Sequence, residues 1–450
     1  MLPINNNQTS NYKAIQFLSG GEKEKIDWML SNMEHNKAFI YKSENLTKIE
    51  KIKLLEKFKK LYINYRISWK GQPKECFENN IYGNKFKELK KIPLCVDLEL
   101  ASICDLACPH CFRQFIPTPD KIMDKKLAFK LIDEASLLGV PSMKFNWRGE
   151  PLLNPSTSEI INYAKKKGIV ETIINTNATV LDIKTAKKII NSGLDTLIYS
   201  FDGGTKSSYE KMRPGRFKEN KYELIIENIK NFSKLRKEMN SAFPRTKIQM
   251  VLTKDTRSEQ NEFFELFKDY VDDVSVKQYS ERGGKIKDID DNFKNKLNIK
   301  FKKSIKNFDP STSIMMDYKN NILVSNERIP CEQPFQRLLI TYDGRASMCC
   351  YDWGVAHPVG VVDELANKVG NTEHNKVLKK SLKKEKSFEL MNLKKTEYFN
   401  ELPKKICSIS NIWNGKEINK VRELHVKNKI NDVKICEGCT FKDTYKWSKH

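Results

Sequence analysis

Three closely spaced cysteines form a potential metal site, because thiolates bind zinc and iron. Cys104, Cys108 and Cys111 form a C-x3-C-x2-C triad, one ligand short of the four that structural zinc sites and ordinary iron–sulfur clusters use. On a four-iron cluster, three thiolates leave one iron open, where a small molecule can chelate. The alternative is a zinc site that His110 or a distant cysteine completes. The triad therefore predicts a metal site, and one of its two forms can bind a reactant.

A second group of cysteines lies near the C-terminus. Cys331 is followed by Gly344-x4-Cys349, and further on by Cys436-x2-Cys439. Four thiolates suit a fully ligated iron–sulfur cluster, and the alternative is a structural zinc site. Such a set has no open position and is suited to moving electrons rather than to binding a reactant.

The 11 cysteines of the chain occur as close pairs and triads. In a chain whose start lacks an export signal, this spacing favours metal binding over disulfides. Outside the two groups, Cys350 or Cys407 could donate a hydrogen atom to a reaction intermediate. A buried free cysteine is the commoner outcome for both.

Residues 93–280 must position the triad, and they alternate predicted strands and helices. Leu94–Leu100 is the first strand, and it ends just before Cys104. Six β/α steps predict a parallel sheet with helices outside it, an open or closed barrel, whose site lies at the carboxyl ends of the strands. The later strands are expected at Ser142–Trp147, Val170–Asn175, Asp195–Phe201, Thr246–Leu252 and Asp273–Gln278, and the helices at Lys125–Leu138, Ser156–Lys167, Ile183–Asn191, Lys221–Met239 and Glu259–Val271.

Local signals set several helix ends. Ser156-x-x-Glu159 predicts a capping box at the start of one helix. Gly139, Gly168 and Gly193 each follow a helical stretch and predict its end.

The fold class expected for the whole chain is α/β, in four segments. Residues 1–92 form a mainly helical extension, in which Leu46–Ile63 carries an apolar helical stripe. Residues 93–280 are the barrel, residues 281–328 a linker, and residues 329–450 a small cysteine-rich domain.

Bulk composition limits the classes of protein. The net charge of +23 could indicate nucleic-acid binding, but the lysines spread along the whole 450-residue chain, which argues against a nucleic-acid partner. No apolar run approaches the roughly 20 residues of a membrane span, and the first ten residues lack a signal-peptide pattern. We therefore expect a cytoplasmic protein without a membrane partner.

Three further motifs follow the second, third and fourth predicted strands. They are Trp147-Arg-Gly-Glu-Pro151, Asn175-Thr-Asn-Ala178 and Ser200-Phe-Asp-Gly203, and Arg213 lies shortly beyond. Together with the triad, and in this order, they resemble the radical S-adenosylmethionine (SAM) superfamily over residues 93–280. The resemblance implies that the sheet forms a partial (β/α)6 barrel, and that the triad holds a [4Fe-4S] cluster whose open iron binds SAM.

The resemblance also implies SAM contacts. A glutamate carboxylate holds the SAM ammonium by charge and hydrogen bonding, a serine and an arginine hold the SAM carboxylate, and an acidic residue lies near the ribose. The implied cofactor-binding residues are Gly149, Glu150, Pro151, Ser200, Asp202 and Arg213. The chain departs from the family pattern at His110, where an aromatic residue is usual, and at Arg148 and Ala178, where glycine is usual.

The C-terminal cysteines resemble the SPASM or Twitch domain of many radical SAM enzymes. The stretch Ile412-Trp-Asn-Gly415, leading to Arg422 and His425, adds to this likeness. Because the further cysteines of the full form are absent, the resemblance implies one auxiliary [4Fe-4S] cluster, held by Cys331, Cys349, Cys436 and Cys439.

The resemblance implies a radical SAM oxidoreductase. Such an enzyme cleaves SAM reductively to a 5′-deoxyadenosyl radical, which abstracts a hydrogen atom from the substrate, and the auxiliary cluster assists a net oxidation. A carbohydrate or aminocyclitol-like small molecule is the preferred substrate, and a flavodoxin or ferredoxin the electron donor. One alternative is the modification of a peptide or of a sulfatase, and a distant one is a non-catalytic iron–sulfur or zinc protein that binds nucleic acid.

Overall fold

The computed structural model describes most of the chain. The described residues are 22–114, 118–217, 219–279, 285–286, 289, 314–316, 322–329, 331–369, 388–389, 405–437, 439 and 444–449. The first ten residues and most of the predicted linker 281–328 lie outside this part. Within the described part of the chain, none of the helices combines the length and hydropathy that crossing a bilayer requires.

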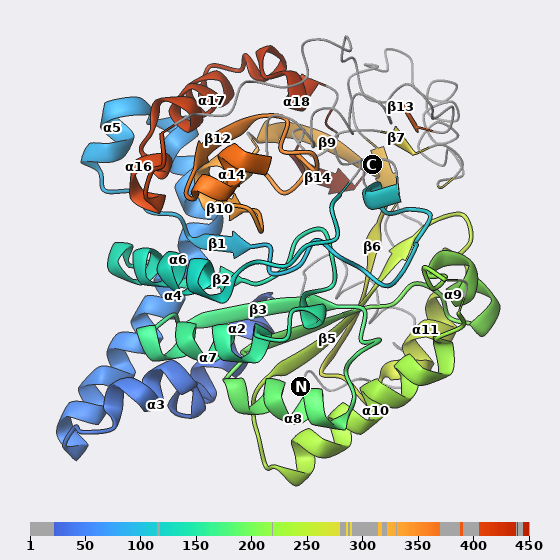
Figure 1. Cartoon of the computed structure of the whole chain (residues 1–450). Helices are drawn as coiled ribbons and strands as arrows, with labels where there is room; N and C mark the ends of the chain where they lie inside the picture. The colour runs from blue at the N-terminus through green and yellow to red at the C-terminus, as the bar shows by residue number, and fades with distance from the viewer. Residues whose placement is uncertain are drawn as a thin grey trace.

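One nine-stranded sheet organises the molecule (Figure 1), in the order β12-β11-β10-β1-β2-β3-β4-β5-β6. Six neighbouring strands run parallel in sequence order, which confirms the predicted partial barrel. They are β1 (Cys95–Leu98), β2 (Ser142–Lys144), β3 (Glu171–Thr176), β4 (Thr196–Ser200), β5 (Arg245–Leu252) and β6 (Asp273–Gln278).

Helices follow these strands and cover the outer face of the sheet (Figure 1). Apolar side chains of the sheet and of these helices share one large core. The short helix over Lys206–Met212, which begins at a Thr205 cap, is absent from the sequence-based prediction. The helices are α6 (Lys125–Leu138), α7 (Thr157–Lys167), α8 (Ile183–Ser192), α9 (Lys206–Met212), α10 (Tyr222–Glu238) and α11 (Gln260–Phe267).

The predicted helix ends are partly correct. Gly139, Gly168 and Gly193 each end a helix in the left-handed conformation, as predicted. The capping box at Ser156 is wrong, because the Ser156 side chain makes no cap hydrogen bond. The Ser156 backbone is not extended, as an N-cap residue requires, and Glu159 pairs with Lys125 at 2.8 Å instead.

The C-terminal segment joins the same sheet. β10 (Arg337–Ile340) pairs in parallel with β1, and β11 (Arg345–Ser347) and β12 (Pro358–Val361) continue outward as antiparallel strands. The predicted tail is therefore continuous with the barrel through the backbone. Its helices are α13 (Gln333–Gln336), α14 (Glu364–Val369), α16 (Ile409–Trp413), α17 (Lys416–Val426), η6 (Ile430–Asp432) and α18 (Lys434–Glu437). Smaller sheets pair β8 (Ile314–Met316) and β14 (Thr444–Lys449) with β9 (Ile322–Ile329), and β7 (Lys285–Ile286) with β13 (Phe388–Glu389).

The N-terminal helices cover the end of the sheet at which the strands begin. Their apolar side chains pack against Leu94, Val170 and Phe243, which precede β1, β3 and β5. The apolar stripe predicted for Leu46–Ile63 is only partly buried, because Ile49 is 67% exposed. These helices are α2 (Glu22–Ser31), η2 (Met33–His35), α3 (Lys37–Ser43) and α4 (Lys48–Glu78), whereas α5 (Gly83–Glu88) packs against Trp413 of the C-terminal segment.

Buried polar contacts fix these helices to the strands. The Asp195 carboxylate accepts hydrogen bonds from Asn36 (2.8 Å), from Lys165 (2.7 Å) and from the backbone N–H and hydroxyl of Thr172. Burial raises the pKa of Asp195 and lowers that of Lys165. Removal of either partner would leave an uncompensated charge in the core.

We expect Asp195→Ala to lower the free energy of unfolding by about 3–5 kcal/mol, the usual cost of breaking a buried pair. Glu159→Ala, which removes the exposed partner of Lys125, is the matched control and should cost less than about 1 kcal/mol. Urea unfolding followed by circular dichroism measures both. Equal losses in the two variants would contradict the assignment.

Candidate active site

The cysteine triad lies in the loop that follows β1, at the carboxyl ends of the parallel strands. Cys108 is buried, and Cys104 and Cys111 are half-buried. The backbone N–H of Cys111 donates to the carbonyl of Cys108 at 3.0 Å. Burial raises the pKa of the Cys104 thiol to about 12, and the charges of Cys104 and Cys111 act on one another. A cationic metal group would offset this cost of ionising the thiols.

The three thiols fit a cluster better than a single metal ion. Among the described residues, no three His, Cys, Asp or Glu side chains converge on one point. A cluster has no such requirement, because each cysteine binds a different iron. The ring nitrogen Nε2 of His110 lies 3.2 Å from Asp202, so it is directed at a carboxylate. This geometry disfavours the zinc alternative.

Glu150 lies beside the triad, fully buried at the end of the turn after β2. Its carboxylate accepts hydrogen bonds from the Thr176 hydroxyl, from the backbone N–H of Asn177 (both 2.7 Å) and from that of Leu152 (3.1 Å). Burial raises the pKa of Glu150 to about 7, and the hydrogen bonds oppose the rise. The structure shows no ion pair to Glu150 within the described residues, so a cationic ligand group would stabilise its charged form.

Gly149 and Pro151 shape this turn. A Cβ atom on Gly149 would lie 2.3 Å from the carbonyl oxygen of Ile103, in the triad loop. Because Gly149 has none, the backbone N–H of Glu150 can donate to that carbonyl at 2.8 Å. Pro151 opens the short helix η4 (Pro151–Leu153), which Glu150 caps. The glycine therefore allows the turn and the triad loop to touch.

The Asn175–Ala178 segment supports Glu150 rather than standing apart from it. Besides the contacts above, the Asn177 amide donates to Asp105 at 2.9 Å and lies 3.8 Å from the Cys104 sulfur. Ala178 has a φ of +61°, a conformation that favours glycine. This backbone explains why glycine is usual at the position in the family.

Asp202 and Arg213 form a buried ion pair behind the triad. The Arg213 guanidinium donates to Asp202 at 2.7 Å, and the backbone N–H of Val251 donates at 2.6 Å. Although burial opposes ionisation, Arg213 and His110 hold the pKa of Asp202 well below its usual range. The link from His110 to Asp202 has no sequence signal beyond the departure at His110. Ser200 ends β4 and is half-buried on the same side.

Arg148, which stands at a family glycine position, is also buried and paired. It donates two hydrogen bonds to Glu99, at 2.6 and 2.7 Å, so its side chain turns away from Glu150. The same guanidinium lies over the Trp147 ring, 4.6 Å from its centroid. Trp147 and Trp353 are neighbours, with centroids 6.1 Å apart. The departure at Arg148 thus connects β1, the turn and the C-terminal loop.

The four C-terminal cysteines lie near one another next to that loop, although within the described residues no three of their thiols meet at a single metal position. Cys349 lies near enough to Cys331 and Cys439 for the three thiols to interact electrostatically. The backbone N–H of Cys439 donates to the carbonyl of Cys436 at 3.1 Å. His425 Nε2 lies 3.8 Å from the Cys436 sulfur. The structure therefore gathers residues that the sequence separates by about a hundred positions.

Trp413 and Arg422, which the sequence comparison singled out, lie in the core. Arg422 donates to the carbonyls of Pro334 and Trp413, and its guanidinium stacks between the rings of Phe86 and Trp413. Arg422 and Trp413 therefore join the C-terminal helices to α5. These two hydrogen bonds of Arg422 go to backbone carbonyls, so its role in these contacts is structural.

The two candidate hydrogen donors lie in different places. Cys350 packs against Trp147, whose ring N–H donates to the Cys350 carbonyl at 2.9 Å. Cys407 packs on the large core between the sheet and the helices, and its N–H donates to the carbonyl of Val361 in β12. Of the two, Cys350 lies nearer the triad and its turn.

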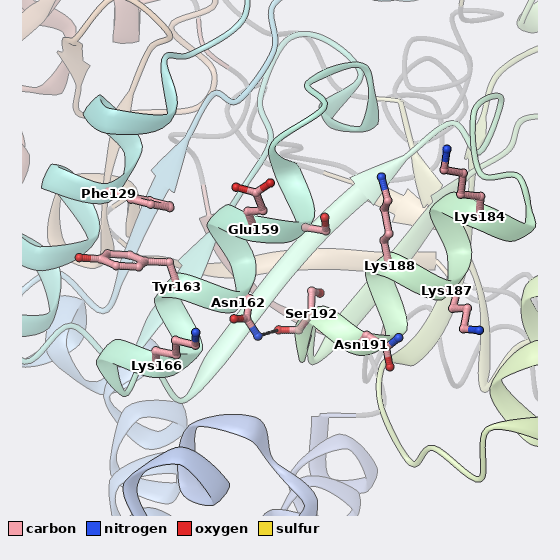
Figure 2. A pocket seen from close by; sticks show the side chains of 11 residues that line it. Phe129, Glu159, Asn162, Tyr163, Lys166, Lys184, Lys187, Lys188, Asn191 and Ser192 are labelled. Atoms are coloured by element: carbon pink, nitrogen blue, oxygen red, sulfur yellow. Dashed lines mark hydrogen bonds between the residues drawn. The ribbon is translucent and has the colours of Figure 1, made fainter.

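A cavity of about 660 Å³ lies elsewhere, between the outer faces of α7 and α8 (Figure 2). Lys166, Lys184, Lys187 and Lys188 line it, with a stacked pair of Phe129 and Tyr163 at one end. Because these are outward-facing helical residues, the cavity is separate from the cysteine sites.

Comparison with known proteins identifies two domains. Residues 98–267 match the radical SAM superfamily, and residues 331–440 match the SPASM iron-sulfur cluster-binding domain. The chain therefore carries a radical SAM domain followed by a SPASM domain, which confirms the resemblance. This pair of domains carries a [4Fe-4S] cluster that binds SAM, together with an auxiliary iron–sulfur cluster.

Curated relatives match part of the chain. The tungsten-containing aldehyde ferredoxin oxidoreductase cofactor-modifying protein of Pyrococcus furiosus is 29% identical over 35% of this chain and 43% of its own length. A GTP 3',8-cyclase of Chlorobaculum tepidum is 33% identical over 24% of this chain and 32% of that protein. The mycofactocin maturase of Mycolicibacterium smegmatis is 23% identical over 38% and 41%. The chain thus spans less than half the length of these relatives.

Solved structures give similar but distant matches. BtrN in complex with AdoMet and 2-DOIA has a TM-score of 0.41 and 14% identity, covering 78% of this chain and 94% of that one. Streptococcus suis SuiB bound to its precursor peptide SuiA has a TM-score of 0.44 and 17% identity, covering 68% and 66%.

The Arg148–Glu99 pair gives a testable prediction. Arg148→Met should lower the free energy of unfolding by about 3–5 kcal/mol, because it leaves the Glu99 charge buried and unpaired. The double variant Arg148→Met with Glu99→Gln should regain part of that loss. Urea unfolding of the two single variants and the double variant measures the coupling. Losses that simply add would show that the two side chains do not interact.

Proposed function

We propose that this protein is a radical SAM enzyme that removes a hydrogen atom from a carbohydrate or aminocyclitol-like small molecule in a net oxidation. When bound, the SAM cluster supplies the electron that cleaves SAM to methionine and a 5′-deoxyadenosyl radical. A flavodoxin- or ferredoxin-type donor would provide that electron. The observation that carries the proposal is the meeting of Glu150, Arg213 and the triad at the strand ends.

The residues of the chain divide the work of holding SAM. Glu150, held by Thr176 and Asn177, takes the SAM ammonium, because burial without a cationic partner favours a positively charged ligand. Arg213, with Ser200 beside it, takes the SAM carboxylate. Asp202, for which the resemblance implies a place near the ribose, orients the Arg213 guanidinium by accepting its hydrogen bond at 2.7 Å.

The four C-terminal cysteines would hold the auxiliary cluster. Their fully protein-ligated set suits electron transfer, so a cluster held there would supply an electron acceptor for the net oxidation. The aromatic contacts from Phe112, next to the triad, through Trp353 to Trp147 lie between the two cysteine loops. All three side chains are buried. Cys350 is proposed as a hydrogen donor only in second place, with Cys407 behind it.

The preference for a small molecule is supported by the position of the N-terminal helices. The apolar side chains of residues 26–69 pack where the strands begin, opposite the triad, which keeps this part of the N-terminal segment away from the proposed SAM site. The names of the curated relatives cover both nucleotide and maturation chemistry. The choice of substrate class therefore rests on this chain's own residues.

Cysteine variants separate the two clusters. Cys108→Ala should lose about four iron atoms per chain and all 5′-deoxyadenosine formation in anaerobic assays with dithionite and SAM. Cys349→Ala should lose a similar amount of iron but still form 5′-deoxyadenosine. Cys76→Ala, at a buried cysteine of α4, is the control and should keep both clusters. Formation of 5′-deoxyadenosine by the Cys108 variant would refute the proposal.

Glu150→Gln tests the ammonium contact. The variant keeps the shape of the side chain and removes its charge, so the dissociation constant for SAM should rise about ten-fold or more, as for loss of a charged hydrogen bond. Anaerobic calorimetry on protein of equal iron content measures this. The exposed Glu159→Gln is the matched control, and equal SAM affinity in both variants would remove Glu150 from the SAM site.

A further inference from the structure

The inner face of the sheet, which turns away from the helices, is unusually rich in charge. In β1, Val96 and Leu98 lie in the core under the helices, so Asp97 points to the opposite, inner face. By the same alternation, Met143 in β2 points outward and Lys144 points inward. This inner face lies below the triad and is where a substrate of the proposed enzyme would bind.

Most charges on the inner face are matched within the protein. Arg337 pairs with Asp97 at 2.9 Å, and Lys247 pairs with Asp273 at 2.8 Å. Higher on the same face, Arg148 pairs with Glu99. In each of these pairs the two charges cancel, so none of the pairs needs a charged ligand for its neutralisation.

Lys144 is the exception. Within the described residues, no carboxylate oxygen lies in salt-bridge distance of its ammonium. Its nearest acidic neighbour along the sheet, Asp97, is already engaged by Arg337 and by the Cys95 thiol at 3.2 Å. Lys144 is half-buried, and burial lowers its pKa despite the attraction of Asp97. An enclosed cation without a close counter-charge is costly unless a ligand supplies one.

The surroundings of Lys144 are those of a binding site rather than of a solvated surface. Cys350 of the C-terminal loop is near enough for its charge to act on Lys144. In the neighbouring strand, the side-chain oxygen of Asn175 is buried and has no hydrogen-bond partner among the described residues. Asn146, two residues after Lys144, accepts a hydrogen bond from the Asn175 backbone and fixes that segment. A cation and an amide acceptor thus line the same inner wall.

We propose that Lys144 binds an anionic oxygen group, a carboxylate or a phosphate, on a carbohydrate substrate. The inference rests on the proposed function and narrows it. A sugar acid or sugar phosphate brings the counter-charge that Lys144 lacks, and its hydroxyl groups can donate to Asn175. An aminocyclitol, by contrast, would bring a second cation to the same wall. Lys144 is assigned as a residue that selects substrate, with no role in cleaving SAM.

Binding of defined sugars to the anaerobically reconstituted holoprotein tests this inference. The probes are gluconate, glucose 6-phosphate, glucose, glucosamine and inorganic phosphate, each titrated by calorimetry in the presence of SAM. The wild type should bind the two anionic sugars at least ten-fold more tightly than glucose or glucosamine. Lys144→Met should lose that preference, Lys144→Arg should keep part of it, and Lys187→Met, at an exposed lysine of α8, should keep all of it.

A second measurement needs no variant. Lys144 should react with an amine reagent such as trinitrobenzenesulfonate, and the anionic sugars should protect it, as mass spectrometry of its peptide would show. Unchanged affinities in Lys144→Met, tighter binding of glucosamine, or no protection would overturn the inference. Binding of inorganic phosphate alone, with no sugar preference, would also overturn it. Formation of 5′-deoxyadenosine by the wild type, assayed separately, reports on the proposed function itself.

Discussion

The parallel pairing of β10 with β1 is the contact on which the arrangement of both cysteine sites depends. Asp97 lies opposite Leu339, and Leu98 opposite Ile340, so the strand before the triad also anchors the C-terminal segment. The loop that follows β11 carries Cys349, and because β11 runs antiparallel to β10, this loop leaves the sheet toward the end where β1 and β10 begin. A slip of one residue would reverse the faces of β10 and remove Arg337 from Asp97. Register and charge pairing therefore enforce one another.

Charge burial is a second constraint, and it explains how the chain tolerates its departures from the family pattern. Arg148 replaces a glycine in the turn beside the SAM site, which would place a cation against a SAM molecule. Glu99, at the end of β1, accepts both of its hydrogen bonds and turns it toward Trp353. His110 likewise has a carboxylate partner, because its Nε2 atom lies 3.2 Å from Asp202. Each substitution is thus accompanied by a buried carboxylate in an adjoining strand or loop.

The sequence contains the local features of this fold but not its long-range ones. The sequence predicted the six parallel strands, the two cysteine groups and the helix ends at Gly139, Gly168 and Gly193. Each of these features depends on a short stretch of sequence: on its apolar periodicity, on the backbone freedom of glycine, or on the spacing of metal ligands. The joining of β10 to β1 could not be predicted, because a short apolar strand such as Arg337–Ile340 gives no sign of its partner. The Ser156 capping box failed since the backbone there is not extended. The partners of Arg148 and His110 lie far away in sequence and are residues of ordinary type.

The charge balance of the inner face connects these constraints to substrate choice. The N-terminal helices close the end where the strands begin, and Tyr65 and Lys25 pair with Glu171 there. Arg337, Lys247 and Arg148 are matched along the wall. On the inner face of the sheet, Lys144 lies between that closed end and the triad. Among the described residues of this face, it is the cation that has no carboxylate partner. The electrostatic cost of leaving Lys144 unmatched favours a polyol that carries a negative group.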